Sequence, residues 1–232
     1  MVQIKEPITP PKAMRLSFQK RGVLQYVSHL DLQRTFTRAI LRAGIPVWYT
    51  EGFNPKPRIA FSPPLSVGCE SVCEMMDFRI VRDASPEEMK AALNANLPPE
   101  LAVFEVYEPT RKMAEIAYAT YLIRIENEGD ESKAEAVRAL LADRPMTVLK
   151  RTKNGEKETD ISPLVQKADV FCAEGDLCIR ATLAAGGGNF LNPEYLVTYL
   201  STGGLILQGA LPTRLYSILR EELLDADLAH FC

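Results

Sequence analysis

The chain has 232 residues, of which 47% are hydrophobic and 25% are charged, and its formal net charge is −3. This length allows one large domain or two small ones, and the composition excludes a disordered or fibrous protein. We find no apolar run of 18 residues, so no membrane helix is expected, and the N-terminal MVQIKEPITPPK lacks the apolar core of a secretory signal.

Five cysteines and two histidines are spaced unlike any common zinc or iron–sulfur site. An odd number of cysteines without a secretory signal favours free thiols in a reducing compartment. The sequence therefore predicts a cytoplasmic protein with no metal, no cofactor and no membrane partner.

The charges are unevenly distributed along the chain. Residues 1–60 contain ten lysines and arginines but three acids, whereas the remaining residues contain 17 basic and 27 acidic side chains. Such asymmetry indicates an anionic partner for the basic part, or else a dipolar surface without one.

The first half alternates between strand and helix patterns. Ser28 is a favourable N-cap with Asp31 three residues later, and Gly44 is placed to end the helix. Ser85 and Pro86 mark the start of a second helix. The expected elements are a strand at 15–19, a helix at 28–44, an extended piece at 47–50, an apolar stretch near 59–61, a strand around 73–81, a helix from 85, and a strand at 101–107.

The second half predicts the same order of elements. They are a strand at 118–125, a helix at 131–142, a strand at 146–151, a turn at 153–155, a strand at 177–183, a helix at 192–200 and a strand at 205–207. The predicted fold is α+β with tandem ferredoxin-like (βαββαβ) domains at 12–110 and 116–232. The acidic, amphipathic segment 213–231 is expected to pack on its own core, with partner docking as the alternative.

A basic stripe lies on the first predicted helix. Arg34, Arg38 and Arg42 recur every four residues and so share one helix face, separate from the apolar stripe. Three aligned guanidinium groups repel one another unless an anion lies opposite, and arginine suits phosphate. A solvated face, with its charge shared by Asp31, explains the stripe equally well.

The loop after this helix, YTEGFNPKPRIAFSPPLSVG, is constrained by Gly52, Pro55 and Pro57. Basic residues interleaved with aromatic ones hold nucleic acid through phosphate contacts and base stacking. The alternative is that the aromatic residues fill the core and the prolines stiffen a crossover. The candidate nucleic-acid-binding residues are Arg34, Arg38, Arg42, Tyr49, Phe53, Asn54, Lys56, Arg58, Arg151 and Lys153.

Two further groups are weaker candidates. Arg151 and Lys153 extend the basic set, although the neighbouring Glu156 and Glu158 favour an exposed hairpin of mixed charge. A glycine loop before a helix can bind phosphate through its backbone N–H groups. Gly187, Gly188 and Asn189 are therefore a phosphate-loop candidate, although such glycines more often form plain loops.

The segments YVSHLDLQRTFTRAILRAG and EGFNPKPRIAFSPPLSVG resemble the radical SAM-linked protein family, densely over residues 14–78 and more thinly through RTKNGEKETDISPLV and GGGNFLNPEYL. The resemblance implies a bacterial, cytoplasmic domain of unknown function that accompanies a radical SAM protein. The chain has no Cys-x3-Cys-x2-Cys motif, so it is expected to be an accessory part.

The predicted architecture is also similar to the RAMP superfamily of CRISPR repeat-processing endonucleases, in which a histidine near the first helix often takes part in RNA binding or cleavage. That likeness makes His29 and Asp31 candidate acid–base groups, although a histidine near a helix cap is more often structural.

Three hypotheses follow. The favoured one is an RNA-binding accessory module for a radical SAM system acting on tRNA or rRNA. The alternatives are a metal-independent RNA-processing endonuclease and a protein–protein adaptor for a radical SAM enzyme.

Overall fold

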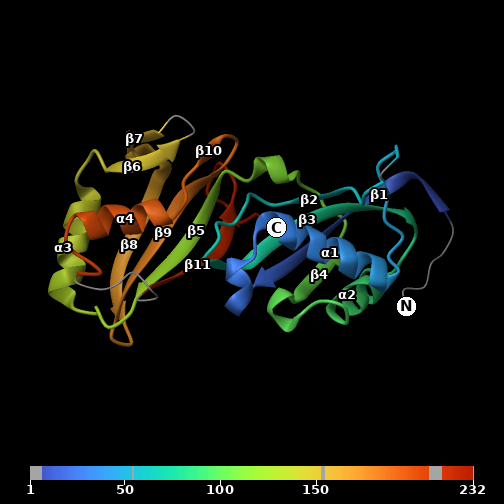
Figure 1. Cartoon of the computed structure of the whole chain (residues 1–232), viewed down its shortest axis with the longest axis horizontal. Coiled ribbons are helices and arrows are strands. Elements are labelled where there is room, and N and C mark those ends of the chain that lie inside the picture. Colours follow the sequence, from blue (N-terminus) through green and yellow to red (C-terminus); the bar gives the residue numbers. More distant parts are fainter. Residues whose placement is uncertain (1–6, 54, 153–154, 209–215, 232) are drawn as a thin grey trace. The chain divides into compact units, whose positions relative to one another are not determined.

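The computed structural model describes residues 7–53, 55–152, 155–208 and 216–231. The chain divides into two compact units, Met1–Met113 and Ala114–Cys232, and each combines helices with antiparallel strands (Figure 1). The α+β class is confirmed. No described helix has both the length and the apolarity needed to cross a membrane.

The first unit contains one four-stranded antiparallel sheet in the order β2-β3-β1-β4. Two helices join these strands, and the Ser28 and Gly44 caps, like the Ser85 cap, are confirmed. The elements are β1 (Pro7–Lys20), η1 (Gly22–Tyr26), α1 (His29–Ala43), β2 (Ile59–Phe61), β3 (Cys69–Arg82), α2 (Pro86–Asn94), η2 (Pro99–Leu101) and β4 (Val103–Tyr107).

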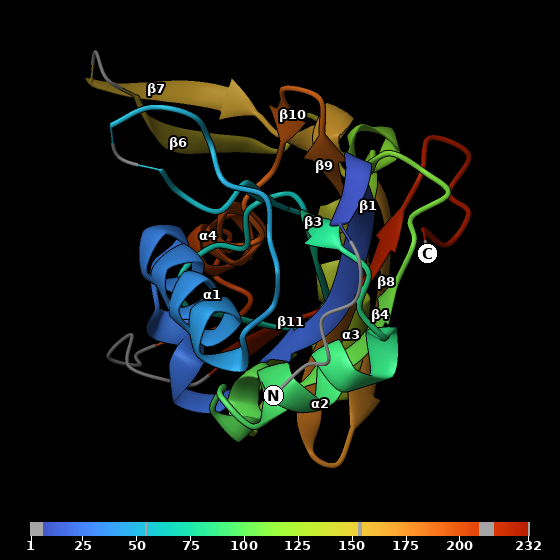
Figure 2. The ribbon, with the colours of Figure 1, turned by 90° about the vertical axis from the view of Figure 1, so that its right-hand side faces the viewer.

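The two faces of this sheet have different chemistry. Successive side chains of a strand point to opposite faces, and the register pairs Leu16 with Met76 and Arg15 with Asp77. Leu16 and Met76 belong to the apolar core that α1 and α2 complete on one side of the sheet (Figure 2). The charged pair therefore lies on the opposite face.

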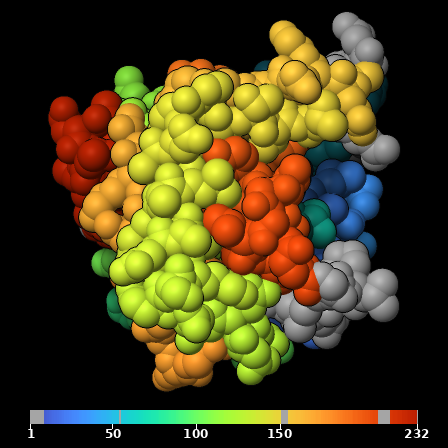
Figure 3. All heavy atoms as spheres, turned by 90° about the vertical axis from the view of Figure 1, so that its left-hand side faces the viewer, coloured from blue at the N-terminus to red at the C-terminus, as the bar shows by residue number. Residues whose placement is uncertain are grey.

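The second unit is built around β9, which pairs with β5, β8 and β10, while β5 also pairs with β11. Figure 3 shows α4 beside α3, with the separate β6–β7 hairpin next to it. The elements are η3 (Met113–Glu115), β5 (Tyr118–Ile125), α3 (Glu131–Ala142), β6 (Thr147–Thr152), β7 (Gly155–Asp160), η4 (Ser162–Leu164), β8 (Val165–Ala173), β9 (Asp176–Gly186), β10 (Asn189–Phe190), α4 (Glu194–Thr202) and β11 (Tyr216–Leu224).

The strand predicted at residues 205–207 is wrong. These residues form bends after α4, and Leu207 has a positive φ of 57°. The last strand of the unit is β11, within the segment predicted only to be amphipathic, and it pairs with β5 along its whole length. Pairing with a distant strand decided the structure here, which the local apolar pattern does not encode.

Candidate nucleic-acid interface

Helix α1 begins and ends where its sequence specifies. The backbone N–H of Asp31 donates to Ser28 Oγ at 3.2 Å, and the Ser28 hydroxyl donates to Asp31 Oδ2 at 2.7 Å. Gly44 ends the helix with a φ of 68°. The buried side chains are Leu32, Phe36, Ala39, Ile40 and Ala43.

This register turns the basic stripe outward. Arg34, Arg38 and Arg42 are all exposed. Arg34 donates to Asp31 Oδ1 at 3.1 Å, so part of its charge is neutralised. The hydrogen bonds from Ser28 and Arg34 lower the pKa of Asp31, which keeps this carboxyl ionised at neutral pH. Within the described part of the chain, no acidic side chain pairs with Arg38 or Arg42.

The loop after α1 is held by its own backbone. The N–H of Thr50 donates to the carbonyl of Lys56 at 2.9 Å, and the N–H of Lys56 donates to Thr50 Oγ1 at 3.1 Å. A bridge between Tyr49 and Pro57 continues this pairing. The loop therefore presents Lys56 from a defined backbone, which reduces the entropy lost on binding.

The structure brings the helix and the loop together. A hollow of about 330 Å³ is lined by residues from both, and its cationic members are Arg34, Arg38 and Lys56. Lys56 is exposed, and the described residues provide no acidic partner for it. Positive side chains from two segments thus border one concavity, and lysine and arginine are the residues that neutralise phosphates. The lining residues are Leu30, Gln33, Arg34, Thr37, Arg38, Lys56 and Pro57.

The predicted aromatic residues differ in their surroundings. Phe53 is completely exposed, with a relative exposure of 113%, so its ring is free to stack on a base. Tyr49 is half-buried and packs against the apolar core, and the neighbouring Phe61 packs against Phe36. Asn54 lies outside the described residues. Of the aromatic candidates, Phe53 has the exposure that stacking needs.

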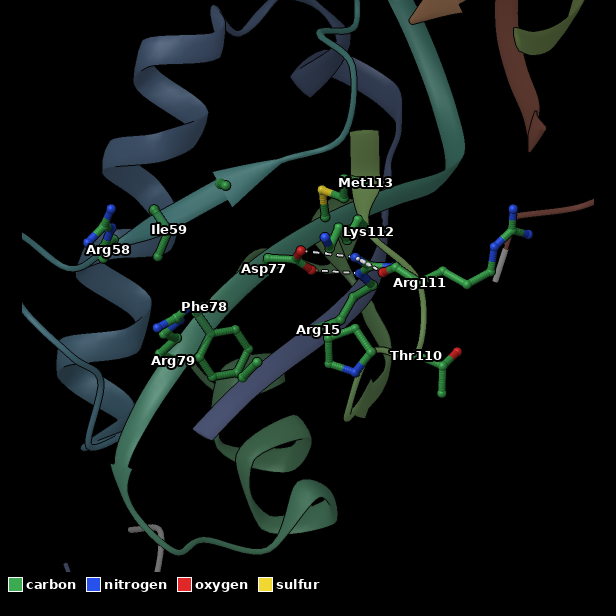
Figure 4. A pocket seen from close by; sticks show the side chains of 13 residues that line it. Arg15, Arg58, Ile59, Asp77, Phe78, Arg79, Thr110, Arg111, Lys112 and Met113 are labelled. Atoms are coloured by element: carbon green, nitrogen blue, oxygen red, sulfur yellow. Dashed lines mark hydrogen bonds and ion pairs between the residues drawn. The ribbon is translucent and has the colours of Figure 1, made fainter. Parts of the chain in front are cut away.

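Arg58 does not join this hollow. Its guanidinium carbon lies 5.0 Å from the centre of the Trp48 ring, and that of Arg79 lies 5.5 Å from the same centre. Arg58 instead lines a second, larger cavity on the sheet face opposite the helices (Figure 4). The predicted set is therefore divided between two surfaces of the first unit.

Sequence reasoning missed most of this second cavity. Its floor contains Arg15 and Asp77, which form a two-point ion pair with bonds of 2.6 and 2.9 Å. Burial disfavours the charged guanidinium, yet the hydrogen bond and charge of Asp77 leave the pKa of Arg15 raised. One signal was available, because Arg15 and Asp77 each interrupt an apolar strand, in MRLSF and MMDFR.

The catalytic candidates His29 and Asp31 are not linked to each other. Asp31 accepts hydrogen bonds from Ser28 and Arg34, while the exposed His29 ring lies 5.3 Å from the Phe61 ring. Among the described residues, no hydrogen bond joins His29 to Asp31. A general acid or base must reach a proton of the substrate, directly or through one water, so their catalytic role stays a prediction.

Among the remaining candidates, Arg151, Gly187, Gly188 and Asn189 belong to hairpins of the second unit. Arg151 lies in β6, and Lys153 is outside the described residues. Gly187 and Gly188 form the turn between β9 and β10, with φ values of 63° and 97°, and Asn189 begins β10. This hairpin geometry accounts for both glycines, and α4 begins only at Glu194, so phosphate binding there stays a prediction.

This α+β protein matches one protein-family model over most of its length. The model described as "Uncharacterized protein conserved in bacteria (DUF2344)" matches residues 13–193, so the chain belongs to this bacterial family. A comparison with curated proteins found no match. The family description names no activity and no partner, so the association with a radical SAM protein stays a prediction.

Proposed function

We propose that this protein is an RNA-binding accessory module, which serves a cytoplasmic radical SAM system in the modification or maturation of tRNA or rRNA. The observation that carries the proposal is the hollow where Arg34 and Arg38 of α1 meet Lys56 of the loop. The radical SAM association rests on the resemblance of residues 14–78 to the radical SAM-linked family.

The surface suits a long polyanion for three reasons. Arg34, Arg38 and Arg42 follow α1 over about two turns, so they match a chain of repeated charges. Arg38 and Lys56 have no competing acid among the described residues, so binding RNA breaks no ion pair at either. The exposed Phe53 ring adds a stacking contact that tolerates any base.

We also infer that both units have the ferredoxin-like plan, with limits at 12–110 and 116–232. The order β2-β3-β1-β4 supports this plan in the first unit. In the second unit, β8-β9-β5-β11 is the equivalent order, with the β6–β7 hairpin inserted before β8.

The test is binding of the purified protein to a mixture of bacterial tRNA and rRNA fragments, measured by fluorescence anisotropy over a series of salt concentrations. The variant Arg34→Glu/Arg38→Glu/Lys56→Glu reverses the charges of the hollow. A matched control, Arg82→Glu/Lys157→Glu/Lys167→Glu, reverses three exposed cations elsewhere.

We expect affinity to fall steeply with salt, because phosphate contacts release counterions. We expect the hollow variant to bind far more weakly than the control. Absence of binding at low salt, or equal losses in both variants, would refute the proposal. RNA recovered in shortened form would favour the endonuclease instead.

A further inference from the structure

The cavity on the sheet face opposite α1 and α2 has a volume of about 810 Å³, within the range of small-molecule sites. Its walls come from β1, β2, β3 and the segment 109–113, all within the first unit (Figure 4). The lining residues are Ala13, Arg15, Arg58, Ile59, Ala60, Asp77, Phe78, Arg79, Pro109, Thr110, Arg111, Lys112 and Met113.

The charge of this lining is strongly positive. Asp77 is its one acid, and both of its carboxylate oxygens accept from Arg15, so this pair is internally neutralised. Arg15 also donates to the backbone carbonyl of Arg111 at 3.0 Å, which ties the segment 109–113 to the floor. The remaining cations of the lining are Arg58, Arg79, Arg111 and Lys112, and they give the cavity its excess charge.

Trp48 holds two of these cations in place. The guanidinium carbons of Arg58 and Arg79 lie 5.0 and 5.5 Å from the centre of its ring. The ring face attracts each cation, but it does not remove the repulsion between them. The described residues contain no acid that pairs with Arg58 or Arg79. An anion bound beside them would relieve that repulsion.

We propose that this cavity binds a small phosphorylated molecule of nucleotide size, with its phosphate groups held by Arg58 and Arg79. Planar guanidinium groups donate paired N–H bonds that match phosphate oxygens. Lys112 adds a cation at the Asp77 end of the cavity, and Ala60, which pairs with Asp77, and Met113 supply apolar surface for the organic part (Figure 4). This site is independent of the proposed RNA surface on α1.

The protein has a built-in reporter for this proposal. Trp48 is the single tryptophan of the chain, so its fluorescence comes from the side chain that contacts both arginines. The full-length protein is titrated with inorganic pyrophosphate, adenosine diphosphate and uncharged adenosine at constant ionic strength. Calorimetry with pyrophosphate measures the same binding without the fluorophore.

We expect a saturable change in Trp48 fluorescence with pyrophosphate and adenosine diphosphate, and none with adenosine. Arg58→Gln/Arg79→Gln should weaken pyrophosphate binding at least about tenfold, because it removes two charge-assisted contacts. The control Arg82→Gln/Lys157→Gln, which changes two exposed cations outside the cavity, should bind like the wild type.

Three results would overturn the proposal. The first is the absence of saturable fluorescence change and of binding heat with both phosphorylated probes. The second is equal binding by the wild type and Arg58→Gln/Arg79→Gln. The third is an RNA oligonucleotide that perturbs Trp48 through these arginines when neither small probe does, because the cavity would then belong to the RNA surface.

Discussion

The first unit has two cationic surfaces that differ in construction. On α1, the arginines are exposed and spaced along a helix, and Lys56 reaches them from a loop. On the opposite side of the sheet, Arg58 and Arg79 contact Trp48 in a cavity whose floor is the part-buried Arg15–Asp77 ion pair. A row of exposed cations along a helix suits a long polyanion, whereas cations held beside one aromatic ring suit a compact one.

The largest expected effect concerns the Arg15–Asp77 ion pair, which we expect to stabilise the fold rather than to bind a ligand. Asp77→Ala leaves the guanidinium of Arg15, which is 1% exposed, without its carboxylate partner. We expect a loss of about 3 kcal/mol in the free energy of unfolding, measured by urea denaturation, because the buried guanidinium loses the carboxylate that balances its charge.

The double variant Arg15→Met/Asp77→Leu serves as the control for that loss. It replaces the buried pair with apolar groups, so it should recover most of the stability. If Asp77→Ala unfolds at the same urea concentration as the wild type, the pair is not structural, and Arg15 then belongs with the ligand-binding cations.

A smaller effect is expected at Phe53, the exposed aromatic residue of the loop after α1. Phe53→Ala should weaken RNA binding by about 1 kcal/mol through lost base stacking, measured by fluorescence anisotropy. It should leave the free energy of unfolding unchanged, since the ring is fully exposed. Phe104→Ala on β4 is a matched control, because that ring is also exposed. Equal RNA affinities of the two variants would remove Phe53 from the interface.

The smallest expected effect concerns Asp31, which offsets the charge of Arg34. Its pKa is lowered from 3.8 by the Ser28 and Arg34 hydrogen bonds, so its stabilising contribution is present at neutral pH. That contribution disappears as the pH falls through the lowered pKa, when the carboxyl becomes protonated. We expect Asp31→Asn to be slightly less stable than the wild type at neutral pH and equally stable in acid.

Urea denaturation at the two pH values measures this difference. Asp31→Asn should also bind RNA slightly more tightly, because it removes an acid from the basic surface. A stability difference that persists in acid would mean that the carboxylate charge is not the cause. Weaker RNA binding by this variant would count against the placement of the RNA on α1.

Helix caps and helical periodicity in the sequence predicted the elements whose bounds depend on neighbouring residues. The bounds of α1 followed from Ser28 and Gly44, and α3 was predicted at its observed residues. β11 was missed because Arg220 and its acidic neighbours obscure the alternation, and pairing with β5 supplies the stabilisation instead. β8 was missed for a similar reason, because several of its residues are exposed and polar.

The two surfaces were predictable to different degrees. The stripe on α1 follows from helical spacing alone, so the sequence revealed it. The cavity depends on Arg15 meeting Asp77, 62 residues away in sequence, and on Arg79 and Arg58 meeting at Trp48. The register between strands determines both contacts, and no local sequence pattern specifies the register between distant strands.

The most direct test of this account is a crossed measurement of RNA and pyrophosphate binding. Arg34→Glu/Arg38→Glu/Lys56→Glu should weaken RNA binding and reduce its salt slope by about three, while pyrophosphate binding stays unchanged. Arg58→Gln/Arg79→Gln should lose pyrophosphate binding and retain most of its RNA affinity. Equal losses of both ligands in both variants would contradict the account, because one surface would then serve both.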